Sequence, residues 1–104
     1  MSNEQHYDAL ETRDANERER SLMERLPRQI AHAQKAAPAF AGILAGVDAS
    51  QVDSRAALAK LPVTRKSELL ALQQKARASD PFGGFGAVGR GPLMRRVFAS
   101  PGTI

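Results

Sequence analysis

The feature that most constrains this chain is a set of apolar residues that repeat with helical spacing. They are Leu22, Leu26, Ile30, Ala33 and Ala37. Successive members lie three or four positions apart, so an α-helix places all of them on one face. Such a face has to be buried against another apolar surface. The pattern therefore predicts an amphipathic helix and a chain that is mainly α-helical.

The sequence also predicts where this helix begins and ends. Asp14 or Asn16 can cap its N-terminus, because short polar side chains accept hydrogen bonds from the first free amides of a helix. Pro27 lies inside the pattern and removes one backbone hydrogen bond, at a cost of about 3 kcal/mol. We therefore expect a kink or a new helix start at Pro27, and the end of the helix at residues 36–38.

Three shorter helical segments are expected further along the chain, over residues 39–44, 55–60 and 65–74. Asp53 or Ser54 can cap the second segment, and Thr64 can cap the third. Pro62 ends the second segment, because a residue that precedes proline avoids the helical region of backbone space. Residues 1–80 are thus predicted to form a helical segment.

The character of the sequence changes at Pro81, where glycines become frequent. Residues 84–89 match the spacing of a dinucleotide-binding loop, but that motif requires a strand before it and a helix after it. Pro92 would break a following helix, so we interpret these residues as an ordinary surface loop. Residues 94–98 are predicted to form a strand, and residues 81–104 together form a segment of loop, strand and turn.

Composition excludes several classes of function. The chain has no cysteine, which excludes disulfides and thiolate metal sites and fits a reducing compartment, so we expect a cytoplasmic protein. His6 and His32 lack a second ligand at metal-binding spacing. Only 5% of the residues are aromatic. The net charge of +4 therefore comes without the basic stripe and stacking aromatics of nucleic-acid binders. We expect neither a nucleic-acid nor a membrane partner.

The last residues form a turn that follows the predicted strand. In Ser100-Pro101-Gly102-Thr103, the hydroxyl groups and backbone amides can donate hydrogen bonds to phosphate oxygens. Taken alone, this sequence is also typical of an ordinary loop turn.

Several segments, in order, resemble the beginning of phenylacetate-CoA ligase-like members of the adenylate-forming superfamily. They are the helix from Arg25, residues 36–40, residues 58–69, residues 81–85 and residues 96–100. The most specific is Leu-Ala-Lys-Leu-Pro-Val-Thr-Arg-Lys-Ser-Glu-Leu at residues 58–69, which is similar to the family's Leu-Pro-hydrophobic-Thr-Lys-polar-acidic-Leu signature. The match covers nearly the whole chain from about Leu22 onward.

The resemblance implies roles for the last residues. The family's phosphate loop reads Ser-Ser-Gly-Thr-Thr-Gly-Lys, and Ser100, Gly102 and Thr103 match three of its positions. These three are therefore candidate ligands of the ATP phosphates in an incomplete loop. Pro101 replaces the second serine and has no N–H, so we expect a weaker or different grip on phosphate.

The resemblance further implies a larger α/β enzyme, of which this chain is an N-terminal helical segment ending in a first strand and a truncated phosphate loop. The complete enzyme would join an aromatic carboxylic acid such as phenylacetate to CoA, using ATP and Mg²⁺ and releasing AMP and pyrophosphate. No catalytic residue is assigned to this chain, and we expect it to bind no cofactor well and to be inactive alone. The alternative is a small non-catalytic helical module that docks through its apolar face. Both readings predict exposed apolar surface, and we expect the chain to self-associate through it.

Overall fold

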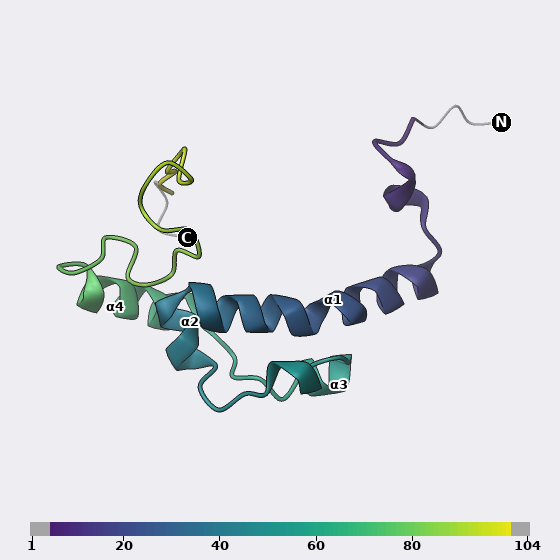
Figure 1. Cartoon of the computed structure of the whole chain (residues 1–104), viewed down its shortest axis with the longest axis horizontal. Coiled ribbons are helices and arrows are strands. Elements are labelled where there is room, and N and C mark those ends of the chain that lie inside the picture. The colour runs from purple at the N-terminus through teal and green to yellow at the C-terminus, as the bar shows by residue number, and fades with distance from the viewer. Residues whose placement is uncertain (1–4, 101–104) are drawn as a thin grey trace. The chain divides into compact units, whose positions relative to one another are not determined.

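A computed structural model describes residues 5–100 of the chain (Figure 1). Its elements are η1 (Ala9–Thr12), α1 (Ala15–Ala36), α2 (Pro38–Ile43), η2 (Ala49–Gln51), α3 (Arg55–Leu58) and α4 (Lys66–Ala76). All of the regular elements in this part of the chain are helices. The prediction of a mainly α-helical chain is therefore confirmed.

Helix α1 is the longest element and begins directly after Asp14, the first of the two predicted caps. The Asp14 carboxylate accepts hydrogen bonds from the amides of Asn16 and Glu17, at 3.1 and 3.2 Å. The helix runs through Pro27 as one element of 22 residues. A new start at Pro27 is thus a wrong expectation, because the bonds of the surrounding turns compensate for one missing bond.

The chain divides into two compact units, and α1 contributes to both. The described part of the first unit comprises residues 5–31 and 48–61, and that of the second comprises residues 32–47 and 62–100. Each unit therefore combines two stretches that are separated along the sequence.

In the first unit, α3 runs beside the N-terminal part of α1 (Figure 1), and Ile30 and Val52 are its buried apolar residues. Arg55 of α3 forms a two-pronged ion pair with Glu19 of α1, with Arg55 Nη2 2.7 Å from Glu19 Oε2. The Ser54 hydroxyl accepts a hydrogen bond from the amide of Ala57 at 3.1 Å. Of the two predicted caps of α3, Ser54 is therefore the one that is used.

In the second unit, the side chain of Gln34 fastens the end of α1 to the turn that follows α2. Its Nε2 atom donates to the backbone carbonyls of Leu44 and Val47, at 3.1 and 2.8 Å. Ala37 and Leu44 are the buried apolar residues of this unit. The positive φ of Gly46, +81°, allows the tight turn between these contacts.

The apolar stripe of α1 is covered unevenly. Ile30 and Ala37 are buried and Leu26 and Ala33 are half-buried, whereas Leu22 stays 44% exposed. The C-terminal part of the stripe is therefore satisfied by the chain's own packing. Only its N-terminal end remains open to a further partner.

Two other predictions are wrong. Helix α4 begins at Lys66 with Arg65 at its N-cap position and no capping side chain, so Thr64 is not the cap. Residues 94–98 form no strand, and within the described chain no segment pairs with them. A strand exists only as part of a hydrogen-bonded ladder, so an extended sequence without a neighbour stays irregular.

Candidate functional site

The predicted phosphate-binding residues are not brought together within residues 5–100. Ser100 is exposed and belongs to an irregular stretch, and Gly102 and Thr103 lie outside the described residues. No backbone hydrogen bond joins residues 95–100 to another described residue. The assignment of these three residues to ATP phosphate therefore remains a prediction from the resemblance.

The glycine-rich loop is organised by Asp80. The Asp80 carboxylate accepts hydrogen bonds from the amides of Phe82 and Gly84, at 2.9 and 3.0 Å. Its backbone carbonyl accepts a third from the amide of Gly83 at 2.9 Å. Two of these amides belong to glycines with positive φ, +63° at Gly83 and +81° at Gly84. The amides of residues 82–84 are therefore all hydrogen-bonded to Asp80 at the start of the loop.

This geometry bears on the G-x-G-x-x-G spacing of residues 84–89. The amide of Gly84, the first glycine of this pattern, is already bonded to Asp80. No helix follows the motif within residues 87–100, so no helix dipole is aimed at it. The prediction that these residues form a loop is confirmed, although the first glycine is buried rather than on the surface.

The loop packs against α2 and α4 at a set of contacts that we call the glycine junction, made of Ala39, Phe40, Gln73, Gly83, Gly84 and Phe85. The amide of Ala39 donates to the carbonyl of Gly84 at 2.9 Å. The rings of Phe40 and Phe85 meet edge to face, with centroids 5.6 Å apart.

Both glycines of the junction allow a close approach of backbones. A Cβ atom on Gly83 would lie 2.5 Å from Cα of Gln73, and one on Gly84 would lie 3.0 Å from the nitrogen of Ala39. Any side chain would push α4 or α2 away. The signal for this role was present in the sequence as Asp-Pro-Phe-Gly-Gly, but the partners of the glycines could not be identified from it.

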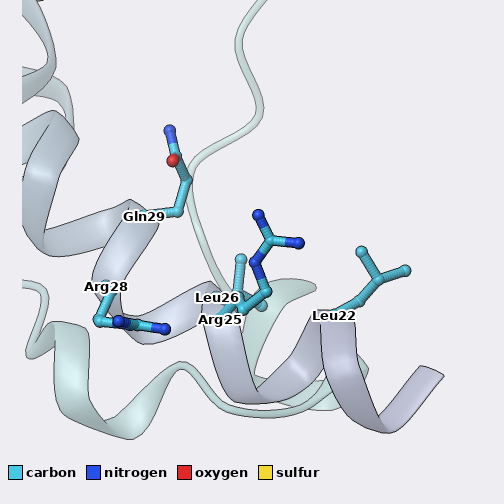
Figure 2. Close-up of a pocket in the computed structure, with 5 residues that line it drawn as sticks. All are labelled: Leu22, Arg25, Leu26, Arg28 and Gln29. Atoms are coloured by element: carbon cyan, nitrogen blue, oxygen red, sulfur yellow. The ribbon is translucent and has the colours of Figure 1, made fainter. Parts of the chain in front are cut away.

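A second feature is a hollow on α1 of about 540 Å³ in the first unit (Figure 2). We call it the α1 groove, and its lining residues are Leu22, Arg25, Leu26, Arg28 and Gln29. In Figure 2 the guanidinium of Arg25 extends between the side chains of Leu22 and Gln29. Sequence periodicity assigned Leu22 and Leu26 to a core, so it did not indicate this groove.

One ion pair in the described chain, Glu19 with Arg55, shifts the pKa values of both its partners. The hydrogen bond from the Arg55 guanidinium lowers the pKa of the Glu19 carboxyl below its ordinary value. His6 Nδ1 lies 3.7 Å from an oxygen of Glu11, and His32 is exposed. Within residues 5–100 no three acidic or histidine side chains are grouped as metal ligands would be. No helix in the same range combines the length and the apolar character needed to cross a bilayer.

Comparison with models of protein families, with curated proteins and with solved structures finds no match to this chain.

Proposed function

We propose that this chain forms the N-terminal helical part of an AMP-forming acid:CoA ligase of the phenylacetate-CoA ligase-like family. The complete enzyme would activate a carboxylic acid with ATP and Mg²⁺ as an acyl-adenylate, and CoA would then displace AMP. In this proposal the rest of the enzyme supplies the contacts to the acid, adenine and CoA. The chain alone would then be inactive.

The observation that carries the proposal is the glycine junction. Residues 36–40 and 81–85 each resemble a family segment, and they meet directly through Ala39 and Gly84. Helix α4 begins at Lys66, within the third family segment (residues 58–69), and packs its Gln73 against Gly83. If the chain has the fold of this family, the segments that resemble the family are expected to pack on one another, as these do.

The irregular end of the described chain also supports the proposal. Val97 is 63% exposed and Phe98 is 85% exposed, and the backbone groups of residues 95–100 have no partner among the described residues. Residues 94–98 form no strand in this chain, but exposed apolar side chains, with backbone groups that have no partner among the described residues, suit a segment that pairs with a sheet supplied by the rest of the enzyme. An adenylation domain would provide such a sheet.

The experiment is a complementation assay. A phenylacetate-CoA ligase that lacks the part corresponding to this chain is mixed with the 104-residue chain, and ATP–pyrophosphate exchange with phenylacetate is measured. We expect neither part to be active alone and the mixture to recover exchange and acyl-CoA formation. Failure of the folded wild-type chain to restore activity, or exchange by the chain alone, would contradict the proposal.

A matched pair of variants sharpens this assay. Gly83→Ala introduces a Cβ that collides with the backbone of Gln73, whereas a Cβ on Gly89 would meet open space. We expect Gly89→Ala to complement like the wild-type chain and Gly83→Ala to complement poorly. Equal complementation by both variants would count against the junction as the shared scaffold.

The second candidate function is a non-catalytic helical interaction module. It is favoured by the α1 groove, where the exposed Leu22 stands beside Arg25 and Arg28. A chain that binds a partner through this groove but fails in the complementation assay would fit this alternative.

A further inference from the structure

The α1 groove combines positive charge with apolar surface. Arg25 and Arg28 are exposed, and neither makes an ion pair with any residue in the range 5–100. Glu24 lies next to Arg25 in sequence but is likewise unpaired there. The apolar side of the groove is formed by Leu22, which is 44% exposed, and by the half-buried Leu26. The groove therefore suits an occupant with carboxylates beside large apolar side chains.

The segment that precedes α1 has this chemistry. Residues 7–14 carry Asp8, Glu11 and Asp14 against the single cation Arg13. In the same segment, Tyr7 is 91% exposed and Leu10 is 58% exposed. Exposed apolar side chains thus alternate with acidic ones from Tyr7 to Glu11, and part of this stretch forms the short helix η1.

The segment is held away from the groove of its own chain. Arg13 and Asp14 connect the segment to α1. On the segment's side, the backbone N–H and Nε of Arg13 both donate to the carbonyl of Leu10, at 3.5 and 3.1 Å. On the other side, Asp14 is fixed as the cap of α1 by the amides of Asn16 and Glu17. Docking in the groove of the same chain would require the chain to reverse its direction at Arg13 and Asp14, where these two sets of bonds lie. A second chain can be reached with both sets intact.

We infer that residues 7–14 of one chain dock in the α1 groove of a second copy. Glu11 and Asp8 face Arg25 and Arg28 of the other chain, and Tyr7 and Leu10 cover Leu22 and Leu26. Each chain offers one segment and one groove, so a two-fold dimer fills both grooves. This inference is independent of the proposed ligase function.

The test is the mass of the full 104-residue chain by sedimentation equilibrium over a range of concentrations, at low and at high salt. We expect a reversible dimer that weakens as salt is added, because exposed ion pairs are screened. Arg25→Glu is expected to weaken each contact about fivefold. Because the substitution occurs twice in a symmetric dimer, Kd should rise about 25-fold.

A charge swap identifies the occupant. Glu11→Arg is expected to weaken the dimer as Arg25→Glu does, and the chain with both substitutions should recover most of the wild-type affinity. Arg20→Glu makes the same charge change at an exposed α1 residue outside the groove, and it should leave Kd within about twofold of wild type. Circular dichroism checks that each variant keeps its helices.

Three outcomes would overturn the inference. They are a monomer at every concentration, a dimer that Arg25→Glu leaves unchanged, and a dimer that Glu11→Arg leaves unchanged. Failure of the double substitution to recover affinity in a folded chain would also overturn it, since the two charges would then not face each other.

Discussion

Phe40 and Phe85 meet edge to face at 5.6 Å although 45 positions separate them in the sequence. This contact joins α2 to the glycine-rich loop, and both rings are half-buried. Edge-to-face aromatic pairs contribute about 0.5–1.5 kcal/mol beyond the area they bury. The pair is therefore a direct probe of whether the second unit folds cooperatively.

A double-mutant cycle measures this contribution. We expect Phe40→Leu and Phe85→Leu each to lower the free energy of unfolding, and the double variant to lose about 1 kcal/mol less than the sum of the two. Urea unfolding followed by circular dichroism gives the four values. Strict additivity would show that the two rings do not interact in solution.

The Gly83 position should tolerate no side chain. Its positive φ and the 2.5 Å approach of a Cβ to Gln73 Cα act together, so Gly83→Ala is expected to destabilise the chain by about 3 kcal/mol. Gly89→Ala, at an exposed position with open space, should change stability by less than about 0.5 kcal/mol. The measurement is the urea midpoint of each variant. Similar midpoints for the two would contradict the close packing of Gly83 against Gln73.

A carboxylate of the same shape should not replace the Gln34 amide without a loss of stability. Gln34→Ala removes two hydrogen bonds at a half-buried site, with an expected loss of about 2 kcal/mol. Gln34→Glu places a charged acceptor against the carbonyls of Leu44 and Val47, so it should be worse than Gln34→Ala at pH 7. Protonation of the glutamate restores a donor, and the two carbonyls raise the pKa of the folded glutamate above the ordinary value. The deficit of Gln34→Glu should therefore shrink as the pH falls through that raised pKa and be smallest once the pH lies below the ordinary pKa of a carboxyl group. A variant as stable as the wild-type chain at pH 7 would exclude this role for Gln34.

The Glu19–Arg55 pair predicts a pH dependence of defined sign. The folded state lowers the pKa of Glu19, so the ionised carboxylate stabilises the fold above the unfolded pKa. That contribution disappears as the pH falls through the lower, folded pKa. The stability difference between the wild-type chain and Glu19→Gln should hence be present at neutral pH, shrink in acid, and also shrink with added salt because both groups are exposed. A difference that stays constant from neutral to strongly acidic pH would contradict the ion pair.

The sequence by itself determined the helices and several of their ends. A helix is built from bonds between residues four apart, so the stripe from Leu22 to Ala37 and the break before Pro38 could be predicted locally. The caps could be narrowed to two residues each, of which the structure uses Asp14 and Ser54. Pro27 misled the prediction because one lost bond is a small part of the energy of a long helix that also packs against neighbours.

Only the tertiary structure decided the long-range relationships. Periodicity identifies the apolar stripe but not which part of it the chain covers, and Ile30 is buried while Leu22 stays open as one wall of the α1 groove. The closure of the glycine-rich loop on Asp80 and its packing against Ala39 and Gln73 depend on segments far apart in sequence. Residues 94–98 have the composition of a strand, but a strand is defined by its neighbour, and none of the described residues provides one.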